Sequence, residues 1–317
     1  MNIAPSAAGA RIVGLGEYQP SNVVTNDDLA KRVDTSDEWI QSRVGIKERR
    51  IAGPDDTVVS MAVAAGGKAL ADSGLAPEDI DLVIVATCTL TEQIPNAAAR
   101  VAAQLGVSAP GAFDVNAACA GFSYALGLAN DAIRAGSSRN ALVIGSEKLS
   151  EVIDWDDRST CVIFADGAGA AVVSAAETPG IGPVVWGSSG ERAQKIHLRE
   201  GKYLYQEGQA VFRWATTELN AVAEEALRRA GVAPTDLHAF VPHQANLRII
   251  ESIARKLGAP QAIIARDIVT AGNTSSASIP LALARMAGRG ELPSGSLVLV
   301  MGFGAGLSYS AQVLEIP

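Results

Sequence analysis

The feature of this sequence that most constrains its fold is an internal repeat. Three blocks recur in the same order, and the first two recur 157 residues apart, as Gly74 and Gly231 illustrate. The paired blocks are 73–81 with 230–238, 116–120 with 273–277, and 166–171 with 303–308. The third pair has a different offset of 137 residues, and the abundance of Ala and Gly offers chance matching as a competing explanation. Because the three blocks recur in the same order, we interpret the repeat as a duplication. Its period is far too long for a solenoid.

The two copies predict two halves of similar fold. The seam falls in the Pro- and Gly-rich stretch 179–183, which divides the chain into an N-terminal half, residues 1–178, and a C-terminal half, residues 179–317. Two similar halves would pack face to face. We therefore expect a functional site where equivalent loops of the two halves meet.

Apolar periodicity favours an α/β fold. Continuous runs of β-branched and aliphatic residues predict buried strands at 82–87, 141–145, 161–164 and 297–301. Helical spacing, with Gly after several segments, predicts helices at 66–73, 97–105, 223–230 and 247–257. Strands that alternate with helices are typical of a mostly parallel sheet in a layered fold.

Charge and cysteine content exclude several classes of protein. The net charge of −8 argues against nonspecific binding to nucleic acid or to anionic lipid. The first ten residues lack the pattern of a secretory signal, and the longest apolar stretch, 297–307, is too short to span a bilayer. The three cysteines are odd in number and form no CxxC pair, which fits a protein of the reducing cytosol.

Cys119 is the first candidate for chemistry. It falls between a predicted strand that ends near Asn116 and a predicted apolar helix, 121–135. The free N–H groups at a helix N-terminus stabilise an anion, so this position should lower the pKa of the thiol. A small buried core thiol is the competing interpretation, and for Cys88 and Cys161, in or beside apolar strands, it is the preferred one.

His243 and Asn273 occupy similar strand-to-loop positions. His243 follows a predicted strand and precedes a helix, and Asn273 begins a run of small residues that could equally be a helix cap. His238 at a predicted strand start and His197 in a loop have no metal-ligand spacing with His243, so we predict no metal site.

The Gly-rich stretch 302–306 follows a predicted strand, and the pattern after it predicts another strand rather than a helix. That context excludes a dinucleotide loop, although the turn could direct backbone N–H groups into a site. Cys, His and Asn at strand ends permit acyl transfer or a papain-like hydrolysis, and the residue types alone do not separate the two.

Five motifs together resemble the β-ketoacyl-acyl-carrier-protein synthase III family. They are the segments 35–40, 117–122, 241–248, 272–275 and 302–306. The resemblance runs from about Arg11 to the C-terminus. It implies the thiolase fold, with two duplicated halves in a five-layer αβαβα sandwich.

The resemblance also implies a reaction and a role for each motif. An acyl-CoA primer would acylate Cys119, and malonyl-acyl carrier protein would then lose CO₂ and attack the thioester. His243 and Asn273 match the pair that hydrogen-bonds the enolate, and the backbone N–H groups of Cys119 and Ala305 match the oxyanion hole. Acyl-CoA is a substrate here, so no cofactor is expected.

Contacts with substrates are implied by the same resemblance. The positions matching CoA contacts are Trp39, Arg43, Arg158 and Arg248. Those matching the acyl-carrier-protein surface are Gln244, Ala245, Asn246, Leu247 and Arg248, with Arg213, Arg255 and Lys256 completing a basic patch. Acidic carrier proteins would be steered to such a patch.

Two departures from the family pattern concern the acyl tunnel. The segment between Gly187 and Val211 is about a dozen residues shorter than in familiar relatives, where it helps to roof the tunnel. Ile94 stands where many members carry a bulky aromatic residue that crosses the dimer and closes the partner's acyl pocket. The resemblance therefore also implies a homodimer.

The resemblance favours the chain-initiating enzyme of fatty-acid synthesis, acting in the cytoplasm. The same chemistry could instead prime a polyketide or another secondary-metabolite pathway. A thioester hydrolase that uses Cys119 and a non-catalytic thiolase-fold subunit are further alternatives, although the presence of Cys, His and Asn weighs against the latter.

Overall fold

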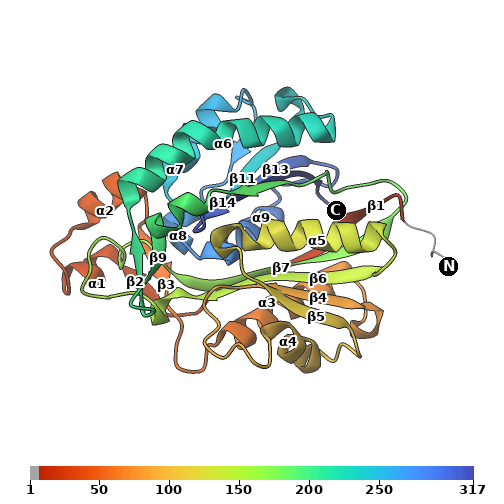
Figure 1. Ribbon diagram of the computed structural model, residues 1–317, viewed down its shortest axis with the longest axis horizontal. Helices are drawn as coiled ribbons and strands as arrows, with labels where there is room; N and C mark the ends of the chain where they lie inside the picture. Colours follow the sequence, from red (N-terminus) through yellow and green to blue (C-terminus); the bar gives the residue numbers. More distant parts are fainter. Residues whose placement is uncertain (1–6) are drawn as a thin grey trace.

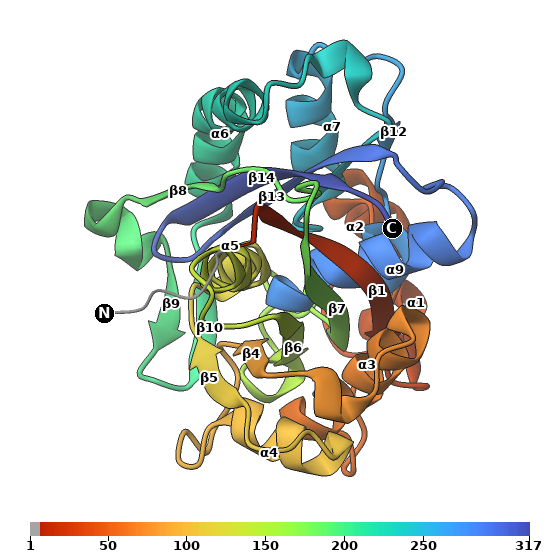
Figure 2. The ribbon, with the colours of Figure 1, turned by 90° about the vertical axis from the view of Figure 1, so that its right-hand side faces the viewer.

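The chain folds into two five-stranded sheets with helices outside and between them (Figures 1 and 2). The computed structural model describes residues 7–317. The expectation about a secretory signal concerns mainly residues 1–6, which lie outside the described residues. Within residues 7–317, no helix has the length and apolar character needed to cross a membrane.

The first sheet has the strand order β1-β7-β6-β4-β5. Its strands are β1 (Gly9–Tyr18), β4 (Leu82–Ala86), β5 (Gly111–Val115), β6 (Asn140–Lys148) and β7 (Asp166–Ala176). Strand β4 runs parallel to β5 and β6, whereas β7 runs antiparallel to β6 and β1.

The second sheet repeats this arrangement in the order β8-β14-β13-β11-β12. Its strands are β8 (Val185–Ser188), β11 (Ala239–Pro242), β12 (Ile263–Ile264), β13 (Leu297–Gly304) and β14 (Ser308–Glu315). Here β11 is parallel to β12 and β13, and β14 is antiparallel to β13 and β8. Both sheets are thus mixed, and the expectation of a mostly parallel sheet is wrong, because the short turn from β13 to β14 allows only an antiparallel pair.

Helices form three layers around these sheets, which gives the expected five-layer sandwich. The helices are α1 (Asn26–Ala30), α2 (Asp37–Val44), α3 (Val58–Ser73), α4 (Ala97–Leu105), α5 (Gly121–Arg134), α6 (Gly208–Ala230), α7 (Leu247–Lys256), α8 (Ile268–Ala271) and α9 (Ser278–Gly288). Helices α3 and α4 cover the outer face of the first sheet, and α6 and α7 cover that of the second. Helices α5 and α9 lie between the sheets and contact both, so they are apolar on more than one side.

The first repeated block has the same structure in both halves. Helix α3 ends at Gly74 and α6 ends at Gly231, both in the left-handed region with φ of 69° and 68°. Short 3₁₀ helices come next, η1 (Pro77–Asp79) and η5 (Pro234–Asp236). In each, the Asp carboxylate accepts a hydrogen bond from the preceding N–H of Ala76 or Ala233.

The second repeated block also has equivalent structure, but the third does not. Residues 118–120 and 275–277 form the matching 3₁₀ turns η2 (Ala118–Ala120) and η6 (Ser275–Ala277). By contrast, Asp166 begins β7, whereas Phe303 lies near the end of β13, the equivalent of β6. That third match is wrong, and it reflects the Gly and Ala content of both segments.

One predicted strand is also absent. Residues 161–164 form turns with a single bridge between Phe164 and Asn273. Their side chains are apolar because they pack beneath α1 and α2 in a separate cluster with Leu29 and Ile40, outside either sheet. The other predicted strands lie within β4, β6 and β13, and the predicted helices within or at the ends of α3, α4, α6 and α7.

Gly169 of β7 lies where the first sheet packs against helix α9 of the middle layer, and there is no room at this position for an added side chain. A Cβ atom there would lie 2.7 Å from the carbonyl carbon of Pro280 in α9. We expect Gly169→Ala to lower the free energy of unfolding by roughly 1–3 kcal/mol, since a close-packed layer must shift. Urea denaturation measures this, with Gly190→Ala as control, because a Cβ at Gly190 meets nothing within 4 Å. Equal effects of the two substitutions would contradict the packing argument.

Candidate active site

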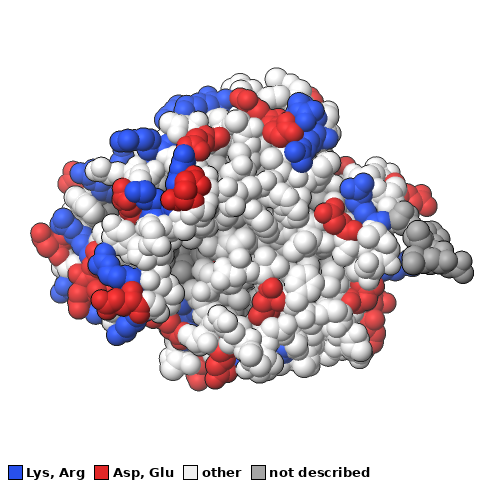
Figure 3. Space-filling view, in the orientation of Figure 1, with Lys and Arg blue, Asp and Glu red and all other residues white. Residues whose placement is uncertain are grey.

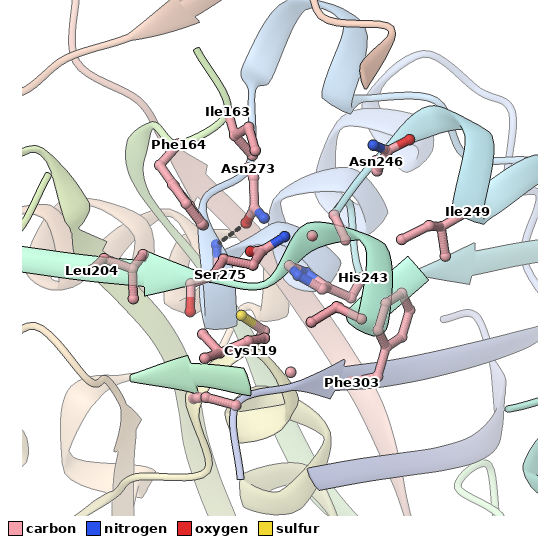
Figure 4. Close-up of a pocket in the computed structure, with 18 of the residues that line it drawn as sticks. Cys119, Ile163, Phe164, Leu204, His243, Asn246, Ile249, Asn273, Ser275 and Phe303 are labelled. Atoms are coloured by element: carbon pink, nitrogen blue, oxygen red, sulfur yellow. Dashed lines mark hydrogen bonds between the residues drawn. The ribbon is translucent and has the colours of Figure 1, made fainter. Parts of the chain in front are cut away.

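A cavity of about 790 Å³ lies where loops of the two halves meet, as the duplication predicts. Cys119 of the first half and His243 and Asn273 of the second half all line it (Figure 4). The structure therefore brings together three residues that are far apart in the sequence.

Cys119 lies in η2, directly after β5 and before α5. The turn is held by Asn116, whose side-chain oxygen accepts from the N–H of Ala118, a residue with φ of 46°. Gly304 of β13 approaches from the other half, and a Cβ there would lie 2.7 Å from Cβ of Cys119 and 3.0 Å from its Sγ. Only glycine at position 304 leaves room for the thiol.

The protonation state of Cys119 differs from the sequence-based expectation. Burial raises the pKa of the thiol to about 11, and the nearby charge of Glu147 adds to that effect. The nearby polar groups of Ser275 and of the Cys119 and Ala305 backbone lower the pKa, but less strongly. The prediction of a depressed pKa is therefore wrong, because desolvation of the thiolate outweighs the helix N-terminus.

Cys119 and Ala305 both line the cavity, on two segments that meet beside the thiol. Two backbone N–H groups directed to one point would form an oxyanion hole. Their role in catalysis stays a prediction.

His243 is buried after β11 and is held on both sides. Its Nδ1 lies 2.7 Å from the hydroxyl oxygen of Ser278, and its ring packs edge-on against Phe303. The N–H of Gln244 also donates to the Ser278 oxygen. When the Ser278 hydroxyl donates its proton to Nδ1, Nε2 carries the imidazole proton and can donate into the cavity. Burial lowers the pKa of His243 to about 3, so the ring is a neutral donor at ordinary pH.

Asn273 is oriented by the turn that comes after it. Its Oδ1 accepts a hydrogen bond of 2.9 Å from the N–H of Ser275, drawn as a dashed line in Figure 4. The amide nitrogen is therefore the group that remains available as a donor. Asn273 is buried, and its carbonyl oxygen accepts from the N–H of Ala165, which fixes the backbone as well.

Cys88 and His197, which the sequence did not assign to a site, line the cavity. Cys88 follows β4 and faces the cavity beside Cys119, rather than lying in an apolar core. Its Sγ contacts Glu147 at 3.4 Å. His197 lies in strand β9 (Ile196–Arg199), not in a loop, and also lines the cavity.

The shortened segment still covers the cavity. Strands β9 and β10 (Tyr203–Gln206) form a hairpin, and Leu198, Leu204 and Gln206 contribute to the cavity wall. A hydrogen bond from the N–H of Leu204 to the carbonyl of Val152 joins the hairpin to the first half.

A second small sheet, β2 (Val23–Thr25) with β3 (Glu48–Arg50), lies near α1 and α2.

The expected CoA contacts gather at one end of the cavity. Arg43 and Arg248 line it, and Trp39 lies next to Arg43. The guanidinium of Arg158 lies 5.0 Å from the Trp39 ring centroid and donates to the carbonyl of Asp34. An aromatic face among three cations suits a nucleotide that carries phosphates.

The expected carrier-protein residues are mostly on the surface of α6 and α7. Lys and Arg atoms gather over these two helices (Figure 3), and Arg213, Arg248, Arg255 and Lys256 are exposed. Ala245, Asn246 and Leu247 are partly exposed, and the Asn246 amide donates to the carbonyl of Arg43.

Gln244 is a correction to this set. It is 1% exposed, because its amide bonds the carbonyl of Pro242 and the N–H of Ile268. It therefore holds the His243 loop and cannot face a docked protein.

Ile94 does not line the cavity of its own chain. It precedes α4 and is 93% exposed, so little of its side chain packs within its own chain. A role in closing an acyl pocket would require that it enter the cavity of a second copy, and that role stays a prediction.

Sequence reasoning missed the polar residues that support the site. Glu147, Ser275 and Ser278 are buried and bond the residues that line the cavity. A glutamate at the end of an otherwise apolar strand was an available signal for Glu147. For Ser278, which lies just beyond the second repeated block, no such signal is present in the sequence. In residues 7–317 no cluster of side chains suited to hold a metal is found.

Comparison with known proteins identifies one family along the chain. Residues 113–190 match the family described as 3-oxoacyl-[acyl-carrier-protein (ACP)] synthase III, and residues 227–316 match its C-terminal region. A β-ketoacyl-[acyl-carrier-protein] synthase III of Streptomyces coelicolor is 56% identical over 313 residues, which cover 98% of this chain and 99% of that protein.

Solved structures agree. The priming β-ketosynthase of the R1128 polyketide pathway has a TM-score of 0.96 and 44% identity over 99% of this chain and 98% of its own. The 3-oxoacyl-[acyl-carrier-protein] synthase III of Aquifex aeolicus has a TM-score of 0.94 and 44% identity, covering 97% of this chain and 100% of that one.

The raised pKa of Cys119 makes its alkylation strongly dependent on pH. Since the thiolate is the nucleophile, the rate of iodoacetamide modification at Cys119 should increase about tenfold per pH unit from pH 7 to 9. Mass spectrometry of the Cys119 peptide follows the reaction, and Cys119→Ser should abolish it. A rate that is flat across this range would show a thiolate already formed at neutral pH.

Proposed function

This chain belongs to the 3-oxoacyl-[acyl-carrier-protein] synthase III family, and from that membership we propose how its residues divide the work of condensation. It is an acyltransferase that joins an acyl primer to malonyl-acyl carrier protein and yields a β-ketoacyl-acyl carrier protein. The observation that carries the residue assignment is the convergence of Cys119, His243 and Asn273 in one cavity, each held in a defined orientation.

In the first half-reaction, acyl-CoA enters beside Arg43 and Arg248 and acylates Cys119. The S–H proton passes to the departing CoA sulfur, so that an enzyme thioester and free CoA thiol are formed. Because the resting thiol is protonated, it must lose its proton before or as the sulfur attacks the acyl carbon. The N–H groups of Cys119 and Ala305 stabilise the tetrahedral oxyanion.

In the second half-reaction, malonyl-acyl carrier protein loses CO₂ and leaves an enolate. Its oxygen receives hydrogen bonds from Nε2 of His243 and Nδ2 of Asn273. Both donors are neutral and buried, so they favour the developing charge without a prior ionisation step. The enolate carbon then attacks the Cys119 thioester, and the thiolate that leaves takes up a proton.

The pathway and the partners are further parts of the proposal. We assign the chain to the initiation of fatty-acid synthesis in the cytoplasm, where its free cysteines stay reduced. Priming of a polyketide is the second candidate, supported by the similarity to the R1128 ketosynthase. We also propose a homodimer, in which the exposed edge strand β5, with Phe113 40% exposed, pairs with its copy, and Ile94 reaches the partner's cavity.

Incubation with labelled acyl-CoA and malonyl-acyl carrier protein tests the activity. A labelled β-ketoacyl product is expected. Free labelled acid would instead indicate a hydrolase, and the absence of both products would indicate a non-catalytic subunit. Competition among acetyl-, branched and medium-chain acyl-CoA primers then separates the two pathways.

Loss of one enolate donor should affect the two half-reactions unequally. We expect His243→Ala or Asn273→Ala to raise the barrier of malonyl decarboxylation by about 3 kcal/mol, on the order of a hundredfold in rate. Self-acylation by acyl-CoA should change much less, because neither donor is assigned to that step. Separate rates of CO₂ release and of Cys119 acylation check this. Equal losses would contradict the division of roles.

Carrier docking should depend on charge over α7. Arg255 is exposed and lies outside the cavity lining, so Arg255→Ala should raise KM for malonyl-acyl carrier protein at low salt and lose that effect as salt increases. Arg134→Ala, an exposed arginine of α5, is the control. If Arg255→Ala raises KM for a small malonyl thioester equally, Arg255 is not a docking contact.

A further inference from the structure

Glu147 is a buried carboxylate that has no role in the proposed half-reactions. It lies at the end of β6 and is 0% exposed. Within residues 7–317, no Lys, Arg or His forms an ion pair with it. An unpaired buried carboxylate is costly unless several hydrogen bonds replace its hydration.

Those hydrogen bonds come from both halves of the chain. The donors are the Thr89 hydroxyl at 2.6 Å, the Ser276 hydroxyl at 2.7 Å, the Cys88 N–H and the Ser275 hydroxyl at 3.1 Å, and the Thr87 hydroxyl at 3.2 Å. The Thr89 oxygen already accepts from the N–H of Lys148, so its own proton is directed to Glu147. Both carboxylate oxygens of Glu147 therefore accept hydrogen bonds, which is the pattern expected for an ionised carboxylate.

The contacts with the second half lead directly to Asn273. Ser275, whose hydroxyl contacts Glu147, has φ of 52°, and its repeat equivalent Ala118 has φ of 46°, so this conformation belongs to the turn in both halves. The backbone N–H of the same Ser275 fixes Oδ1 of Asn273. The carboxylate thus anchors the turn that orients the amide.

The duplication shows that this arrangement is specific to one half. Ser276 and Gly304 are the repeat equivalents of Cys119 and Glu147. Gly304 leaves space beside Cys119, whereas Glu147 fills the corresponding space beside Ser276 and bonds it. One turn therefore keeps an open reactive group, and the other is held rigid.

We propose that Glu147 is a positioning residue for condensation, which anchors the Ser275–Ser276 turn that orients Asn273 and places a negative charge beside Cys119. The first part rests on the proposed role of Asn273. The second rests on the contacts of Glu147 with Cys88 and Ser275, which line the cavity with Cys119, and it agrees with the raised pKa of the thiol. The other titratable groups around Cys119 are Cys88 and His243, and burial keeps His243 neutral.

Three variants separate the anchor from the charge. Glu147→Gln keeps the shape and removes the charge, so alkylation of Cys119 should shift to lower pH by roughly one unit. Ser275→Ala keeps the charge but removes a hydroxyl that joins the turn to the carboxylate, so malonyl decarboxylation should slow more than self-acylation. Glu147→Ala removes both anchor and charge, so Cys119 should be alkylated faster at pH 7 while malonyl decarboxylation slows roughly tenfold or more.

The measurements are the pH profile of iodoacetamide modification of the Cys119 peptide, read by mass spectrometry, and the separate rates of CO₂ release and self-acylation. Asp72→Asn is the matched control, because that carboxylate accepts the N–H of Leu15 and is not among the residues that line the cavity. The control should leave both the profile and the ratio of the two rates unchanged.

The unequal effect expected on the two half-reactions makes the test decisive. Loss of a residue needed only for folding would slow self-acylation and decarboxylation together, and exposure of the thiol would speed its alkylation. An unchanged alkylation profile in Glu147→Gln, or an equal loss of both half-reactions in Glu147→Ala, overturns the proposal. Should Glu147→Ala not fold, Glu147→Gln decides the role of the charge through the alkylation profile, and Ser275→Ala decides the role of the anchor through the ratio of the two half-reactions. Condensation by the wild-type protein in the same assay tests the proposed function separately.

Discussion

The structure depends on two equivalent contacts between the halves. In each contact, a strand of one half approaches the turn that precedes a middle-layer helix of the other half. Gly145 at the end region of β6 lies against the backbone of Ser276, and Gly302 of β13 lies against the backbone of Ala120. A Cβ at either position would collide with main-chain atoms, so no side chain can stand there without a shift of the helices α5 or α9 that begin after these turns. These contacts fix the position of one half relative to the other, and the distances between cavity residues of different halves depend on that position.

The chemistry is built on these contacts from unequal residues at equivalent places. The two turns share an Asn whose side chain accepts the N–H two residues later, at Asn116 and at Asn273. They differ in the residues after this Asn, because one turn carries a thiol that faces the cavity and the other carries hydroxyls bonded to Glu147. Position 243 holds a histidine bonded to Ser278, whereas its repeat equivalent, Ala86, has no side chain able to react. The fold supplies two similar places, and side chains make only one of them a reaction centre.

Local patterns were sufficient for much of the fold, and they placed Cys119, His243 and Asn273 at strand-to-loop positions, but only the resemblance to the family grouped the three into one site. Apolar runs located β4, β6 and β13, and the repeat predicted two equivalent sheets. The same logic failed at 161–164, because burial beneath α1 and α2 gives an apolar run without a sheet partner. It failed for the pKa of Cys119, since helix position is visible in the sequence but the depth of burial is not. Gln244 and Cys88 were misjudged for a related reason, as the direction of each side chain is set by segments distant in the sequence.

The paired turns also bear on how such a protein could arise. Two identical half-length chains, associated as α5 and α9 associate here, would carry the same residue at both members of every pair. A cysteine at one turn would then require a cysteine at the other. In the same way, if the residue beside the first turn were glycine, the residue beside the second turn would also be glycine and could not be glutamate. Covalent joining of the two copies removes that restriction, because each member of a pair can be inherited and altered alone. The single chain therefore permits an asymmetric centre within a symmetric fold.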